Sequence, residues 1–217
     1  MKIKVCGLRQ PENITEVLGL GIDFAGFIFH KRSPRHAASA ELMRWMENNP
    51  QPFESTAKVG VFVNAELDYI LNVVHDYQLD YVQLHGNESP GYCRELKLLW
   101  SVSTLRKAKI IKAFSVAADF NFRDTGEYVD SCPLFVFDTG GHPEAGGTGQ
   151  KWDWERLAAY QHPVPFLLSG GIGPEDAAAV RALQHPQLAG VDVNSRFESA
   201  PGVKDVSQLA AFVEALR

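Results

Sequence analysis

Two side chains of the types needed for proton transfer stand at the ends of short β-rich runs. Cys6 closes the run Lys2–Cys6, and Asp138 follows the run Leu134–Phe137. A thiol, whose ordinary pKa is about 8.5, can act as a general base where positive charge favours the thiolate. A carboxyl group whose pKa is raised by burial can act as a general acid. The alternatives are a small buried apolar residue for Cys6 and a helix cap or salt bridge for Asp138.

Glycine-rich or polar turns after two later β-rich runs predict an anion-binding seat. Ser169-Gly170-Gly171-Ile172-Gly173 leads from a strand directly into a helix, and Asn194 and Ser195 end the following strand. Glycine lets backbone N–H groups approach a phosphate closely, and a helix N-terminus adds favourable partial charge. A tight turn that binds nothing is the other interpretation.

Further polar groups could complete a site. Arg35, in a basic loop, could grip a substrate carboxylate with its guanidinium fork or belong to an ordinary solvated loop. Lys112 could be a Schiff-base nucleophile, but we expect it to point into a barrel as a positioning charge. For His30 and His85 hydrogen-bonding roles are favoured over metal ligation, because no carboxylates accompany them. The glycine-dense segment 140–149 indicates a mobile lid, with a flexible loop that has no function as the alternative.

The elements that must position these groups alternate along the chain. We predict eight strands: Lys2–Cys6, Phe24–Phe29, Lys58–Val63, Tyr81–Leu84, Lys109–Phe114, Leu134–Phe137, Pro165–Ser169 and Gly190–Val193. We predict helices between and after them: Pro11–Leu20, Ser39–Asn48, Glu66–Tyr77, Pro90–Leu98, Trp152–Tyr160, Pro174–Leu183 and Val206–Leu216. A short or irregular element is expected within Val116–Tyr128, and Asp205 is the expected N-cap of the last helix.

This order predicts an α/β protein with a single (β/α)8 TIM barrel over residues 1–217. Parallel strands joined by right-handed crossovers close into a barrel when there are eight, whereas an open doubly wound sheet more usually has five or six. The chain of 217 residues leaves little beyond a minimal barrel of about 200. Active sites of such barrels lie at the C-terminal ends of the strands, where the polar residues above are expected to meet.

Composition narrows the class of protein. The formal net charge is −5, without a basic face, so no nucleic-acid partner is expected. The three cysteines are scattered and odd in number, the start of the sequence alternates like a strand, and the apolar runs are short. We therefore expect a cytoplasmic protein without a membrane partner, either a monomer or a homodimer, with a small molecule as its ligand.

The residues together resemble the phosphoribosylanthranilate isomerase family over essentially the whole chain. The resemblance is carried by motifs in a fixed order: Lys4-Val5-Cys6-Gly7-Leu8, Gly26-Phe27-Ile28-Phe29 with Ser33-Pro34-Arg35, Lys58-Val59-Gly60-Val61-Phe62-Val63, Val82-Gln83-Leu84-His85-Gly86, Phe137-Asp138-Thr139, Gly146-Gly147-Thr148-Gly149 and Ser169-Gly170-Gly171-Ile172. Each motif alone is weak, whereas their order is specific.

The resemblance implies an Amadori rearrangement of N-(5-phosphoribosyl)anthranilate in tryptophan biosynthesis, without a metal or cofactor. It implies that Cys6 is the general base, that Asp138 is the general acid and that Arg35 binds the anthranilate carboxylate. The implied phosphate seat is formed by Gly170, Gly171, Asn194 and Ser195. Where the family commonly has Ser-Ser-Gly, this chain has Asn-Ser-Arg, and Arg196 could add a phosphate contact or point away.

Other readings of the same barrel remain. Indoleglycerol-phosphate synthase needs a lysine and a glutamate on the early strands, and ribulose-phosphate epimerase needs a metal cage, neither of which the strand ends supply. A catalytically silent barrel that binds a metabolite is the third reading, which Cys6 and Asp138 argue against.

Overall fold

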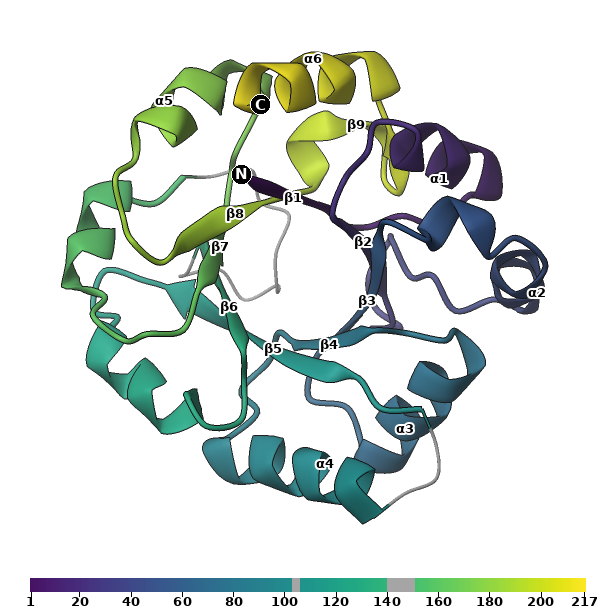
Figure 1. Ribbon diagram of the computed structural model, residues 1–217, viewed down its shortest axis with the longest axis horizontal. Helices are drawn as coiled ribbons and strands as arrows, with labels where there is room; N and C mark the ends of the chain where they lie inside the picture. The colour runs from purple at the N-terminus through teal and green to yellow at the C-terminus, as the bar shows by residue number, and fades with distance from the viewer. Residues whose placement is uncertain (103–105, 140–150) are drawn as a thin grey trace.

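Eight parallel strands close into a barrel, as Figure 1 shows in a view down the axis. The computed structural model describes residues 1–102, 106–139 and 151–217. The ring closes where β1 pairs with β8, in the register Val5 to Val193. The strands are β1 (Lys2–Val5), β2 (Phe24–Ile28), β3 (Ala57–Phe62), β4 (Tyr81–Leu84), β5 (Lys109–Val116), β6 (Leu134–Thr139), β7 (Phe166–Leu168) and β8 (Leu188–Val193). The predicted fold class is therefore confirmed.

Both faces of the strands are buried, which explains why the strands are largely continuous apolar runs rather than strictly alternating ones. One apolar cluster fills the barrel; it comprises Phe24, Val59, Ile111, Ala113, Leu134, Val136 and Leu167. Alternate residues such as Phe27, Phe62 and Phe137 belong to a larger cluster under the helices. The period of two along each strand thus decides whether a side chain faces the interior or the helix layer.

Helices surround the barrel as an outer ring (Figure 1). The α-helices are α1 (Pro11–Leu18), α2 (Ala40–Asn48), α3 (Leu67–Asp76), α4 (Pro90–Val102), α5 (Ala177–Ala182) and α6 (Val206–Leu216). The predicted N-cap Asp205 is confirmed, since its Oδ1 accepts a hydrogen bond of 3.1 Å from Gln208 N. None of the described helices is long and apolar enough to cross a lipid bilayer.

Short 3-10 helices replace some predicted α-helices. They are η1 (Gln51–Phe53), η2 (Phe122–Tyr128), η3 (Trp154–Ala159), η4 (Pro174–Asp176) and η5 (Ser195–Phe197). The predicted α-helix Trp152–Tyr160 is wrong in type, because η3 occupies this stretch. The irregular element expected within Val116–Tyr128 is η2, where the missing side chain of Gly126 lets His162 approach closely.

A small hairpin after β8 was not predicted. It joins β9 (Glu198–Ala200) to β10 (Val203–Lys204) through Pro201 and Gly202. Gly202 has φ +83°, a conformation that glycine adopts at little cost in the second central position of a turn. The hairpin precedes α6, and its two charged residues, Glu198 and Lys204, turn inward.

Candidate active site

Cys6 lies directly after β1, on the strand face that points into the barrel. Its backbone N–H donates to the Val193 carbonyl at 2.9 Å. The sulfur lies against Gly26, where an added Cβ would come within 3.0 Å of Sγ, so glycine in the neighbouring strand makes room for the thiol. Burial raises the pKa of the Cys6 thiol, and the positive charge of Lys4 offsets only part of this rise. The free protein therefore holds Cys6 as a thiol.

A buried ion pair supports Cys6 from below. Lys4 Nζ lies 2.7 Å from Asp192 Oδ2, with side-chain exposures of 0% and 5%. Burial opposes the charge on Lys4, but Asp192 and Cys6 together raise its pKa above the ordinary value. Sequence reasoning missed both partners. Lys4 precedes Cys6 by two residues and Asp192 precedes Asn194 by two, so strand alternation carried a signal that could have found them.

Asp138 reaches the same half of the interior from β6. Its Oδ2 lies 3.2 Å from Nε2 of His85, whose Nδ1 lies 3.2 Å from Gln83 Nε2. His85 thus makes the hydrogen-bonding contacts expected of it. Burial would raise the pKa of Asp138, but the hydrogen bond and charge of His85 reverse the effect and hold that pKa below its ordinary value. The charge of buried Asp192 contributes to the raised pKa of Cys6, and the charge of Asp138 contributes to the raised pKa of Asp192, although burial is the largest cause in both cases.

The turn after β7 contains two successive glycines in the left-handed region of φ. Gly170 has φ +94° and Gly171 has φ +67°. A side chain at Gly170 would collide with Thr139 and come within 3.0 Å of Asp138 Oδ1. Glycine is therefore required at position 170 by packing against the end of β6, independently of any ligand, and this packing brings the turn beside Asp138.

The turn after β8 is held from inside the protein. Asn194 Oδ1 accepts a hydrogen bond of 2.7 Å from Lys204 Nζ, and Ser195 begins η5. Arg196 points away from this turn toward η4, the 3-10 helix that follows β7, where its Nη2 lies 2.8 Å from Glu175 Oε1 in an exposed ion pair. Of the two roles considered for Arg196, the structure favours the second.

Arg35, in the loop between β2 and α2, is already paired. Its Nε and Nη2 donate to Glu198 in a bidentate arrangement with distances of 2.7 to 3.0 Å. Glu198 also accepts a hydrogen bond of 2.7 Å from Lys204 Nζ, and these partners keep its pKa below the ordinary value although burial opposes this. Sequence reasoning missed Glu198 and Lys204; the Pro201-Gly202 turn signal between them was the available indication.

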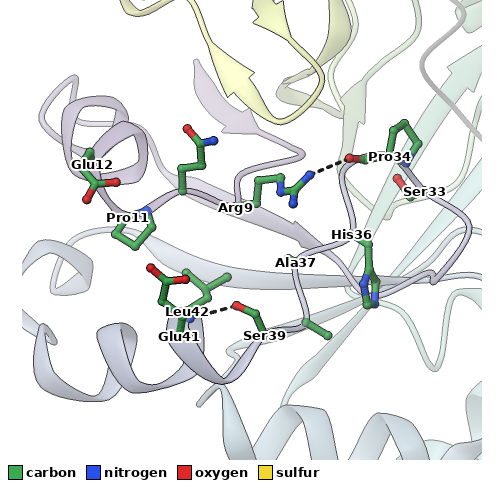
Figure 2. Close-up of a pocket in the computed structure, with 12 residues that line it drawn as sticks. Arg9, Pro11, Glu12, Ser33, Pro34, His36, Ala37, Ser39, Glu41 and Leu42 are labelled. Atoms are coloured by element: carbon green, nitrogen blue, oxygen red, sulfur yellow. Dashed lines mark hydrogen bonds between the residues drawn. The ribbon is translucent and has the colours of Figure 1, made fainter.

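A polar cleft of about 720 Å³ lies beside this loop, between the starts of α1 and α2 (Figure 2). Figure 2 shows Arg9 reaching across to the Pro34 carbonyl, a hydrogen bond of 3.0 Å that ties the β1–α1 loop to the loop of Arg35. The cleft is lined by both signs of charge, since Glu12 and Glu41 accompany Arg9. Its walls therefore brace the Arg35 loop from outside the barrel.

The expected direction of Lys112 is wrong. Ile111 and Ala113 face the interior, so Lys112 between them faces the helix layer. There its Nζ lies 3.2 Å from Glu88 Oε2 and donates to the carbonyls of Leu84, Gly86 and Ala113 at 2.8 to 3.1 Å. The cation fixes the turn that follows β4, which carries His85, and it does not line the mouth.

One expectation concerns residues that the structure does not describe. The predicted lid, 140–149, and its motif Gly146-Gly147-Thr148-Gly149 lie outside the described residues. Within residues 1–102, 106–139 and 151–217, no group of three or more histidine, cysteine, aspartate or glutamate side chains could hold a metal ion.

Comparison with known proteins now adds to this geometry. The sequence model of the family described as N-(5'phosphoribosyl)anthranilate (PRA) isomerase matches residues 3–215. An N-(5'-phosphoribosyl)anthranilate isomerase of Parabacteroides distasonis is 44% identical over 214 residues, covering 99% of this chain and 92% of that protein.

Solved structures agree with the sequence comparison. The phosphoribosyl anthranilate isomerase of Thermus thermophilus superposes with a TM-score of 0.82 at 26% identity, covering 100% of this chain and 98% of that one. A phosphoribosyl anthranilate isomerase in complex with reduced 1-(o-carboxyphenylamino)-1-deoxyribulose 5-phosphate gives a TM-score of 0.76 at 27% identity, with the same coverage.

Proposed function

Because the chain belongs to the N-(5'-phosphoribosyl)anthranilate isomerase family, an isomerase family of tryptophan biosynthesis, we propose that Cys6 is its general base and Asp138 its general acid. The observation that supports this assignment most is that Cys6, directly after β1, and Asp138, near the end of β6, lie at the same end of the closed barrel on inward-facing positions of their strands. The substrate is N-(5'-phosphoribosyl)anthranilate, and the product is 1-(2-carboxyphenylamino)-1-deoxyribulose 5-phosphate.

The first step opens the sugar ring. Asp138 donates its proton to the ring oxygen as the bond between that oxygen and C1' breaks, and the nitrogen lone pair forms a C1'–N double bond, giving a cationic iminium. The low pKa of Asp138 in the free protein means that the acid form must be favoured by the ligand. The substrate carries a carboxylate and a phosphate, and their negative charge raises the pKa of a neighbouring carboxyl group.

The second step moves a proton from carbon. The Cys6 thiolate takes the proton from C2', the electrons of that C–H bond form a C1'–C2' double bond, and the iminium becomes a neutral enolamine that tautomerises to the ketone. In the free protein the Cys6 sulfur carries its proton, and the thiolate forms when that proton passes to the Asp138 carboxylate, which then holds the proton used in ring opening. The positive iminium lowers the free energy of a nearby thiolate and also acidifies the C2' proton. The base and the acidic C–H bond are therefore both available once the ring has opened.

Binding groups take the two anionic ends of the substrate. We assign the carboxylate to Arg35 and the phosphate to the backbone of Gly170 and Gly171 with the turn of Asn194 and Ser195. The positive φ values of the two glycines support this, because glycine at such a turn lets a phosphate approach the backbone N–H groups closely. No cofactor enters the scheme. We further propose that residues 1–217 work as one catalytic domain, as a monomer or homodimer, in the cytoplasm.

The test is an isomerase assay with freshly prepared N-(5'-phosphoribosyl)anthranilate on wild type and Asp138→Asn. Wild type should convert the substrate, and the variant should lose kcat by about 10²- to 10⁴-fold, the usual contribution of one acid–base group. An inactive wild type would overturn the activity. An active wild type with a fully active Asp138→Asn would overturn only the assigned acid.

A further inference from the structure

Three charged side chains with little exposure form a chain of ion pairs between the two proposed anion-binding ends of the site. Arg35 pairs with Glu198, Glu198 pairs with Lys204, and Lys204 donates to Asn194. The exposed fractions of the side chains are 14% for Arg35, 4% for Glu198 and 0% for Lys204. Both Glu198 and Lys204 come from the β9–β10 hairpin, which is folded so that its charges face inward.

The geometry leaves one edge of the Arg35 guanidinium free. Glu198 takes Nε and Nη2, the two donors on one side of the planar fork. Nη1 donates to no group within the described part of the chain. Together with the second hydrogen of Nη2, it forms another donor edge of the planar guanidinium, away from Glu198. A fork held on one side by a carboxylate can still accept a second carboxylate on its other side. The internal pair thus fixes the direction in which the external one must approach.

This chain of ion pairs also holds two cations, Arg35 and Lys204, close together. Burial lowers the pKa of Lys204 below its ordinary value, Glu198 opposes this by its charge and hydrogen bond, and repulsion from Arg35 adds to the lowering. Without the negative charge of Glu198 two neighbouring cations would face each other in a buried region, and the Arg35 side chain would be free to move. Space is also limited around it, because a Cβ at Gly7 would lie within 2.8 Å of Arg35 Cδ and 2.6 Å of Asn194 Oδ1.

We propose that Glu198 is a positioning residue that sets specificity for the carboxylate of the substrate. It holds Arg35 so that the free edge of the guanidinium faces the anthranilate carboxylate, and through Lys204 it ties this edge to Asn194 at the phosphate turn. The distance between the two anion-binding ends is thereby fixed by a single hairpin. This inference rests on the proposed function, since it assigns the carboxylate end to Arg35.

The test compares two substrates on wild type and Glu198→Gln. One substrate is N-(5'-phosphoribosyl)anthranilate, and the other is N-(5'-phosphoribosyl)aniline, which lacks the carboxylate. For the anthranilate substrate we expect kcat/KM to fall about 10- to 100-fold, mainly through KM, as for loss of one charge-assisted contact. For the aniline substrate the two proteins should differ far less. Arg35→Met should show the same loss of discrimination.

A purely structural role for Glu198 predicts another pattern. Equal losses on both substrates, or no loss on either, would overturn the inference while leaving an active wild type and the proposed function intact. Inactive wild type on both substrates would instead overturn the proposed function. If Glu198→Gln fails to fold, the double variant Glu198→Gln with Lys204→Met removes both opposite charges, and the same ratio of kcat/KM values between the substrates decides the matter.

Discussion

Two buried clusters of this barrel contain the same three kinds of side chain, yet only one of them faces the mouth. Inside the barrel, Lys4 pairs with Asp192 beside Cys6. In the helix layer, Lys112 pairs with Glu88. Each cluster thus has a lysine, a carboxylate and a thiol, since Cys93 and Cys132 lie in the field of Lys112.

The clusters differ in how completely their hydrogen bonds are satisfied. Lys112 donates to three backbone carbonyls, and Glu88 accepts from Asn64 N at 2.7 Å and Gly86 N at 2.9 Å. Asp192 Oδ1 in the interior cluster has no hydrogen-bond partner among the described residues. A saturated cluster stabilises a fold, whereas a cluster with spare capacity can still interact with something that arrives. Residue types alone do not make this distinction.

Replacing one cysteine of each cluster by alanine should give the largest difference in kcat between the two clusters. Cys6→Ala should lower kcat by about 10²- to 10⁴-fold because the proposed general base is removed. Cys93→Ala should keep kcat close to wild type and cost only about 1 kcal/mol of stability, as for many small buried substitutions. Turnover with N-(5'-phosphoribosyl)anthranilate and urea unfolding measure the two effects. A fully active Cys6→Ala would end the distinction between the clusters.

Removing the outer lysine should affect stability rather than chemistry. Lys112→Met leaves the Glu88 carboxylate buried without its cation, so the free energy of unfolding should fall by about 3–5 kcal/mol. Its kcat should change far less than that of Cys6→Ala. Urea denaturation checks the prediction, with Lys107→Met on the exposed surface as the matched control, for which a change within about 0.5 kcal/mol is expected. Equal stability of the two variants would contradict it.

The pH profile sharpens the role of the inner cluster. The pKa of Asp138 is lowered and that of Cys6 is raised, while the proposed mechanism needs protonated Asp138 and ionised Cys6. Both requirements are met by a singly protonated pair, whose active arrangement is a constant minor fraction between the two pKa values. We therefore expect kcat/KM to be flat through neutral pH, to fall with acid below the Asp138 pKa and with alkali above that of Cys6.

Rates at closely spaced pH values, with fluorescence at each pH to verify folding, check this profile. A steady rise of about one log unit per pH unit through neutrality would show that one group alone titrates.

The smallest effect is expected for Arg196, outside both clusters. Arg196→Gly should leave KM within about twofold, because the side chain pairs with exposed Glu175 and surface pairs contribute little. Glu175→Gln, which breaks the same pair from the other side, should behave alike. A KM that rises strongly in Arg196→Gly alone would assign the arginine to the phosphate.

The order of the strands and the residues at their ends could be predicted from local sequence patterns. Strands buried on both faces are short apolar runs, and they alternate with amphipathic stretches that form helices. The positions of Cys6 and Asp138 at the carboxyl ends of β1 and β6 could be predicted in this way, and their catalytic roles stay predictions. Lys112 was given the wrong direction because its neighbours are apolar on both sides, so hydrophobicity alone could not identify the inner face. Glu198 could not be found in this way, since its role depends on a partner 163 residues away.

The ion pair of Lys4 with Asp192 spans 188 residues of sequence. No partial ring can bring these two charges together, because the last strand must first reach the first one. Closing so long a loop costs conformational entropy. The contacts that offset this cost form only when the complete set of strands is present. During refolding, turnover should therefore return only after β8 has paired with β1, and a nascent chain that stops before β8 cannot form the ion pair beside Cys6.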